Sequence, residues 1–275
     1  MYDSVASLTT ISVSKLLEGD EASAAQLLKA CTEVGFFYLD LRSPKTDDTL
    51  RDVEQLFKTA DDLFNLDVDE KRQYNTDKYN DSKVHGLVLD CHIQLDLWEP
   101  ANWYEVSELG LFGLGDRMVP FAGPGPIQDA KKPLTSCIRS LHDISLAILS
   151  TLYESLGRPE GAPFQDCHRQ DQASMTGLGL LRYQPLSHTF DKVGHLAHTD
   201  AGSLSFVFTN SGGLQVLMPD NSWQFVEPCP GHAVVNVGDT HVLVQGQVEV
   251  ESSPGCSSPF LCNDNKDYCG IFTPS

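Results

Sequence analysis

The stretch that decides the fold begins at residue 178 with LGLLRY, and short apolar runs then recur along the chain. These runs are SLSFVFT (203–209), LQVLM (214–218), WQFV (223–226), AVVNV (233–237) and HVLV (241–244). Each is rich in Val, Leu or Phe, and turn residues such as Gly, Pro, Asn and Asp separate most of them. Short β-prone runs between turn residues are typical of a mostly antiparallel barrel or sandwich.

The residues before this region favour helices instead. Apolar positions at helical spacing predict a helix from Asp20, as its N-cap, to Val34, and Gly35 is placed to end it. The run FFYL (36–39) predicts a buried strand, and further amphipathic patterns predict helices over 47–64 and 133–156. The sequence therefore indicates an α+β fold in which a helical N-terminal region packs against a β-barrel.

The change in pattern along the chain divides it into three regions. We expect an N-terminal helical and strand region over 1–130, a barrel core over 131–244 and a divergent tail over 245–275. The tail is rich in turn residues and cysteines, with little alternation, so it is not expected to extend the sheet.

Charge and composition limit the function classes. The 275 residues carry 19 Lys and Arg against 38 Asp and Glu, a net charge of −19, which argues against nucleic acid or anionic membrane as partners. We see no apolar stretch of membrane-spanning length and no secretory leader pattern, so a cytoplasmic protein with a small-molecule ligand is expected. The sequence does not specify an oligomeric state.

The stretch Gly194–Phe208, GHLAHTDAGSLSFVF, carries the chemistry. Side chains alternate along a strand, so His198 and Asp200 would share a face, together with Leu204, Phe206 and Phe208 if the strand resumes in phase. An imidazole and a carboxylate in an apolar interior need a positive partner, and a divalent cation supplies one. A surface turn is the alternative for such a short motif.

Several segments, in this order along the chain, resemble the isopenicillin N synthase-like Fe(II)- and 2-oxoglutarate-dependent dioxygenases. They are ACTEVGFFYL (30–39), LDVDEK (66–71), WYE (103–105), LLRYQP (180–185), HTD (198–200), GLQV (213–216) and PGHAVVNVGD (230–239). The resemblance implies a jelly-roll barrel, a double-stranded β-helix, with a metal ion inside it.

The resemblance also implies a chemistry and its residues. In this family two His and one carboxylate hold Fe(II), and oxidative decarboxylation of 2-oxoglutarate generates the oxidant for a small organic substrate. His198 and Asp200 match the first two ligands. Tyr183, in LLRYQP, matches a tyrosine that hydrogen-bonds a carboxylate of co-substrate or substrate, and a half-buried strand tyrosine is the alternative.

The chain departs from the family after Asp239. Relatives carry a second metal-binding His there and, further on, an Arg-x-Ser that grips 2-oxoglutarate, but His241 is the only His after Asp239 and no Arg follows Arg182. His241 is the one candidate for the missing ligand, but it stands where relatives usually carry an aliphatic strand residue, and a core-edge strand residue hydrogen-bonded to the backbone is the alternative for it. The third ligand therefore stays unassigned. His232 is expected to be solvated in its turn, and Lys266, in the tail, lacks the fork of an Arg.

Two accounts fit this departure. In one, the sequence after Val244 is foreign to the family and leaves the barrel incomplete at its C-terminal end, so activity is impaired in this form. In the other, the barrel is kept as a non-catalytic binding module. The leading expectation is an Fe(II)- and 2-oxoglutarate-dependent oxidoreductase with impaired activity, and the binding module is the alternative.

Overall fold

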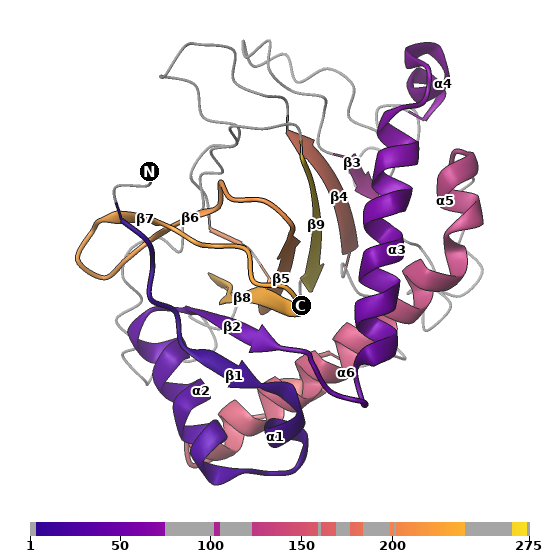
Figure 1. The fold of residues 1–275 in the computed structure, drawn as a ribbon. Coiled ribbons are helices and arrows are strands. Elements are labelled where there is room, and N and C mark those ends of the chain that lie inside the picture. The colour runs from indigo at the N-terminus through magenta and orange to yellow at the C-terminus, as the bar shows by residue number, and fades with distance from the viewer. Residues whose placement is uncertain are drawn as a thin grey trace.

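A seven-stranded sheet forms the centre of the fold (Figure 1). The computed structural model describes residues 4–74, 102–104, 123–158, 161–168, 177–183, 199–200, 202–239 and 266–273. The strand order is β1-β2-β8-β5-β9-β4-β3. The strands are β1 (Thr10–Ser12), β2 (Phe36–Asp40), β3 (Asn102–Tyr104), β4 (Gly177–Tyr183), β5 (Leu204–Thr209), β8 (His232–Val237) and β9 (Lys266–Thr273).

Most strand pairs of this sheet are antiparallel. Only β1 and β2 run parallel, with Ile11 opposite Leu39, among the pairs that the structure describes. A separate two-stranded sheet joins β6 (Gln215–Leu217) to β7 (Trp223–Phe225). The predicted antiparallel β-region is therefore confirmed.

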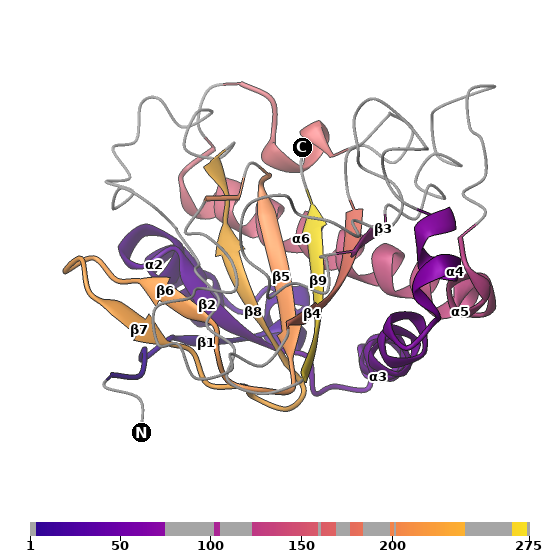
Figure 2. The same ribbon diagram turned by 90° about the horizontal axis from the view of Figure 1, so that it is seen from above.

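Helices cover one side of the seven-stranded sheet, as the view from above shows (Figure 2). The long helices α3 (Asp47–Phe64) and α6 (Lys131–Ser155) contact each other, and both contact β4. The remaining helical segments are α1 (Val13–Leu17), α2 (Glu21–Glu33), α4 (Val68–Gln73), α5 (Gly125–Asp129) and the 3-10 helix η4 (Phe164–Cys167).

Local signals account for the bounds of the predicted helices. Asp20 caps α2, because its carboxylate accepts a hydrogen bond from the backbone N–H of Ser23 at 3.1 Å. Gly35 follows this helix with φ 79°, a left-handed conformation that glycine adopts without steric cost. The helix predicted over 47–64 has the same bounds in the structure, and the one predicted over 133–156 begins two residues earlier, at Lys131.

Alternation along the strands separates two apolar cores. Phe37 and Leu39 of β2, with Val235 of β8, belong to the larger core, which the helices α3 and α6 share. Phe36 and Val234, from the same two strands, belong to a smaller core with residues of the β6–β7 hairpin. The sheet therefore has a helix-facing side and a hairpin-facing side, and odd and even positions of a strand lie on different sides.

The tail contributes a strand to the middle of the sheet. β9 pairs antiparallel with β5 on one side, where Phe206 lies opposite Ile271, and with β4 on the other, where Leu180 lies opposite Cys269. The prediction that this segment cannot extend the sheet is wrong for 266–273. These residues, KDYCGIFT, include Tyr, Ile, Phe and Thr, which favour strands, and two existing strands provide their hydrogen-bond partners.

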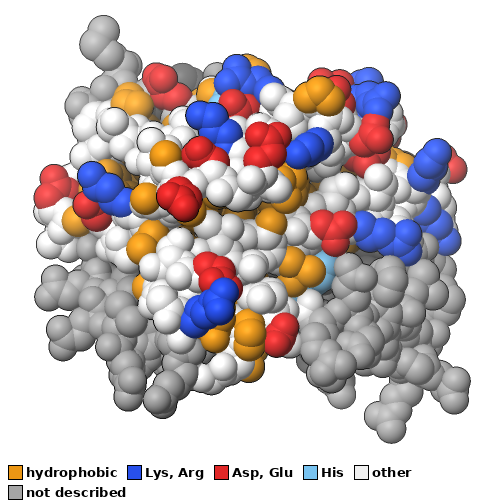
Figure 3. All heavy atoms as spheres, turned by 90° about the horizontal axis from the view of Figure 1, so that it is seen from below, with side chains coloured by type: hydrophobic (Ala, Val, Ile, Leu, Met, Phe, Trp, Pro, Cys, Tyr) orange, Lys and Arg blue, Asp and Glu red, His pale blue; other side chains and the backbone are white. Residues whose placement is uncertain are grey.

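The surface carries charges of both signs. On the face seen from below, acidic and basic side chains of the described residues lie interspersed, with isolated hydrophobic side chains between them (Figure 3). In the described part of the chain, we find no helix of the length and apolarity that crossing a bilayer requires.

Candidate metal centre

Backbone and side-chain hydrogen bonds hold Asp200 against the end of β8. The N–H of Asp239 donates to the carbonyl oxygen of Asp200 at 2.8 Å, and that of Gly238 donates to the carbonyl oxygen of Ser203 at 3.0 Å. The hydroxyl of Thr199 donates to Oδ2 of Asp239 at 2.6 Å. The segment carrying Asp200 is therefore fixed on both sides of this residue.

Gly238 makes this close approach possible. A Cβ atom at this position would lie 2.1 Å from the carbonyl oxygen of Gly202 and 2.8 Å from that of Asp200. No real Cβ atom approaches backbone so closely, so a larger residue here must push the two segments apart. The sequence signal was present, because this glycine belongs to the VNVGD segment (235–239), but only the structure shows what it contacts.

The carboxylate of Asp200 is held by Asn236, a buried residue of β8. Nδ2 of Asn236 donates to Oδ2 of Asp200 at 2.8 Å, and Asn236 is 5% exposed. An amide that hydrogen-bonds one carboxylate oxygen fixes the orientation of the group, as in the surroundings of many metal-ligating carboxylates. Sequence reasoning missed Asn236, although a polar residue inside the apolar run AVVNV was the available signal.

The sequence predicted that Asp200 lies on the same side of the sheet as Leu204, Phe206 and Phe208, but it lies on the other side. Leu204, Phe206 and Phe208 belong to the helix-facing core. Asn236 lies next to Val235 of that core in β8, so its side chain is on the hairpin-facing side, and Asp200 contacts it there. The expected continuity of phase from Asp200 to Leu204 is therefore wrong, because β5 begins only at Leu204 and the bends before it do not continue its alternation.

Two histidines lie near the segment that carries Asp200: His168 contacts Ser203 of this segment, and His142 neighbours His168. Nε2 of His168 is 3.0 Å from the hydroxyl of Ser203, which is 3% exposed. Burial lowers the pKa of His168, and the neighbouring His142 of α6 lowers it further. Burial also lowers the pKa of His142, whose Nε2 has no hydrogen-bond partner among the described residues. Both rings are therefore neutral at pH 7, and sequence reasoning singled out neither.

The other predicted site residues are only partly described. His198 and His241 lie outside the described residues. Tyr183 is the last residue of β4, and its backbone pairs with Lys266, the first residue of β9. Lys266 therefore belongs to a strand of the sheet. No group of three metal-binding side chains occurs within the described ranges.

His232 differs from its prediction as well. It is the first residue of β8 and its side chain is only 5% exposed, so the expected solvated position is wrong. The reason is that β8 begins directly after the turn and pairs this residue with Asp40 of β2.

Comparison with known proteins settles the family. The model of the N-terminal region of non-haem dioxygenases in morphine synthesis matches residues 8–111, and that of the 2OG-Fe(II) oxygenase superfamily matches 174–253. A 2-oxoglutarate-dependent dioxygenase of Gibberella zeae is 32% identical over 88% of this chain and 71% of its own length. The chain belongs to the 2-oxoglutarate-dependent dioxygenases. Another such dioxygenase, from Glarea lozoyensis, is 34% identical over 85% of this chain and 68% of its own.

Solved structures show the same fold. A Neurospora crassa protein, solved in complex with α-ketoglutarate and 5-formyluracil, matches with a TM-score of 0.70 at 20% identity and covers 100% of this chain and 88% of its own. A 2OG-Fe(II) oxygenase family protein of Caulobacter crescentus matches with a TM-score of 0.71 at 20% identity, over 98% of this chain and 87% of its own. The predicted jelly-roll fold with a helical N-terminal region is therefore confirmed.

The described residues of this dioxygenase fit the metal of its family. Fe(II) and 2-oxoglutarate are the cofactor and co-substrate that family membership assigns to the chain. A carboxylate is a suitable ligand for Fe(II) in a site with two histidines. Asp200 presents such a carboxylate, oriented by Asn236 and supported by a segment that is hydrogen-bonded to β8.

Proposed function

We propose that this dioxygenase binds Fe(II) through His198 and Asp200 and oxidises a small organic molecule. The observation that carries the proposal is the hydrogen bond from Asn236 to the carboxylate of Asp200, two residues after His198. A partly buried carboxylate fixed in this way is a preorganised ligand, because little reorganisation remains when the ion binds.

The residues of the chain have distinct roles in this proposal. His198 and Asp200 are the metal ligands, and Tyr183 hydrogen-bonds a carboxylate of co-substrate or substrate. Asn236 and the backbone of Gly238 and Asp239 hold Asp200 in place. When bound, Fe(II) with 2-oxoglutarate supplies the oxidant for the organic substrate.

We further propose that turnover is slow in this form. No Arg follows Arg182, so the chain has no guanidinium in the region where relatives bind the distal carboxylate of 2-oxoglutarate. A guanidinium binds a carboxylate with two parallel hydrogen bonds, which a lysine ammonium does not reproduce. The third protein ligand is unassigned, and His241 is the one His after Asp239. These departures also support the second candidate, a barrel that binds ligands without turnover.

Succinate release from 2-oxoglutarate tests the proposal and separates it from the second candidate. We expect slow, Fe(II)-dependent succinate release by the full chain, and loss of it in His198→Ala and Asp200→Ala. Asp220→Asn, which removes an exposed carboxylate from the turn before β7, is the matched control and should keep the activity. Metal binding without succinate release in the full chain would support the binding module. Equal activity in His198→Ala would overturn the assignment of the ligands.

A further inference from the structure

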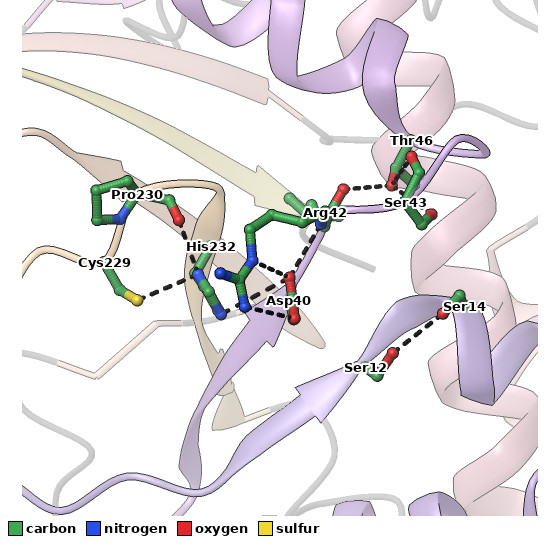
Figure 4. A network of polar contacts seen from close by, with 10 residues as sticks. Ser12, Ser14, Asp40, Arg42, Ser43, Thr46, Cys229, Pro230 and His232 are labelled. Carbon is green, nitrogen blue, oxygen red and sulfur yellow. Dashed lines mark hydrogen bonds and ion pairs between the residues drawn. The ribbon is translucent and has the colours of Figure 1, made fainter.

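A second polar cluster lies at the other end of β8 (Figure 4). It joins Asp40 and Arg42, at the end of β2 and just after it, to Cys229 and Pro230 in the turn before β8 and to His232, where β8 begins. His232 and Asn236 are four residues apart on this strand, which corresponds to about 13 Å. The cluster is therefore separate from the candidate metal centre.

Asp40 is the fixed anion of the cluster. Nε and Nη2 of Arg42 donate to its two carboxylate oxygens, each at 2.9 Å, and the backbone N–H of Arg42 donates to Oδ1 at 3.0 Å. These bonds from Arg42 lower the pKa of Asp40 to about 2. Nε2 of His232 lies 3.7 Å from Oδ1, so a protonated His232 would be an ion-pair partner of Asp40.

The turn determines which nitrogen of His232 carries hydrogen. Nδ1 lies 3.0 Å from the carbonyl oxygen of Pro230, and a carbonyl oxygen can only accept. Nδ1 must therefore donate. Sγ of Cys229 is 3.1 Å from the same Nδ1, where it can accept the second branch of this hydrogen bond. Attack by the sulfur as a nucleophile requires a thiolate, and the N–H of His232 is placed to hydrogen-bond the sulfur in that state.

The other groups around the cluster are compatible with that charge. Arg42 carries a positive charge that interacts electrostatically with Cys229. Tyr38 packs edge-to-face against His232, with ring centroids 6.2 Å apart, and donates its hydroxyl hydrogen to the backbone carbonyl of Glu227 at 2.7 Å. Burial raises the pKa of Tyr38, so its ring is uncharged at pH 7. Among the described residues near Tyr38, the carboxylate of Glu227 is a second anion beside Asp40.

We propose that Cys229 is a nucleophilic thiol, activated by His232, and a site of modification by hydroperoxides. The thiolate sulfur attacks one oxygen of the peroxide, so that an S–O bond forms and the O–O bond breaks. The thiol gives its proton to solvent before the attack. Sulfur is oxidised by two electrons to sulfenic acid, and the leaving hydroxide, reduced in the same step, takes a proton from solvent and leaves as water, while Nδ1 of His232 keeps its hydrogen and donates to the sulfur.

The exposure of the cluster limits the reagents that can reach it. Cys229 is half-buried and the His232 side chain is 5% exposed, whereas the Arg42 side chain is 62% exposed. Hydrogen peroxide is the smallest hydroperoxide, so the partial burial of Cys229 hinders it least. We therefore expect larger hydroperoxides to react more slowly than hydrogen peroxide.

The test traps the sulfenic acid with dimedone. The full chain is treated with hydrogen peroxide in the presence of EDTA, and each cysteine is followed by peptide mass spectrometry. Cys167 is the internal reference, because it is exposed. Although Cys229 is less exposed, we expect it to be labelled about tenfold faster than Cys167. A Cys229 rate at or below that of Cys167 would overturn the proposal.

Two sets of variants separate activation from loss of structure. His232→Ala removes the N–H that faces the sulfur and should lower labelling of Cys229 about tenfold, whereas His232→Gln, whose amide can still donate, should lower it less. Arg42→Gln should slow labelling, and Lys45→Gln, which removes an exposed cation nearby, should not. Cys137 is buried and should stay unlabelled in every folded variant. Unchanged labelling of Cys229 in folded His232→Ala would overturn the role of His232.

Discussion

Asn236 donates a hydrogen bond of 2.8 Å to the carboxylate of Asp200, although the two residues are far apart in the sequence. The contact exists because the end of β8 is hydrogen-bonded to the segment around Asp200. It brings a buried amide to the residue that the family resemblance identifies as a metal ligand. The geometry of the candidate centre therefore depends on the residues that orient Asp200 as well as on the ligands.

Asn236→Leu should weaken metal binding. Leucine has a similar size but no donor, so the Asp200 carboxylate loses the group that orients it. Loss of such a partner reduces metal affinity by about 10- to 100-fold. Calorimetric titration with Mn(II), as a stable substitute for Fe(II), measures the change. Gln224→Leu removes an amide on β7 that contacts Ser222 and should leave the affinity unchanged. Equal affinities in wild type and folded Asn236→Leu would contradict this role.

Gly238→Ala should destabilise the chain. The added methyl group would lie 2.1 Å from the carbonyl oxygen of Gly202, so backbone must move and the hydrogen bonds around Asp200 must lengthen. We expect a loss of about 3 kcal/mol in the free energy of unfolding, measured with urea. Gly125→Ala is the control, because a Cβ atom there meets no atom within 4 Å, and it should change stability by less than about 1 kcal/mol.

Stability should fall on acidification through His142 and His168. The pKa values of both are lowered in the folded chain, mainly by burial, so the unfolded chain binds more protons. Their contribution is therefore complete above the unfolded pKa of about 6.5 and decreases as the pH falls below it. Urea unfolding at pH 7.5 and pH 5 measures the difference. His142→Leu should make it smaller, and an undiminished difference in this variant would refute the assignment.

Removal of β9 should prevent folding. A chain ending at residue 265 lacks the strand between β5 and β4, so both would expose unpaired N–H and C=O groups and invite aggregation. We expect no cooperative thermal transition for this chain. A chain that lacks only residues 274–275 should melt as the full chain does. A cooperative transition at the same temperature in both would show that β9 adds nothing to stability.

Local pattern predicted much of the fold, because elements depend on residues close in sequence. The apolar stripe of Val53, Ala60 and Phe64 is visible at helical spacing and is buried, and α3 has the predicted bounds. The strands β2, β5 and β8 follow from their β-prone runs. The segments around His198, Asp200 and Gly238 likewise carried the family resemblance, which family models and relatives then confirmed.

The sequence by itself determined the three longest helices, α2, α3 and α6, the main strands and the family, since each depends on residues that are close together in the sequence. Tertiary structure alone decided the side of the sheet on which Asp200 lies, since bends before Leu204 interrupt the alternation between Asp200 and β5. It also decided the insertion of β9 and the meeting of Cys229, His232 and Asp40. These relationships join segments distant along the chain, and strand pairing and packing create them in ways that local periodicity does not specify.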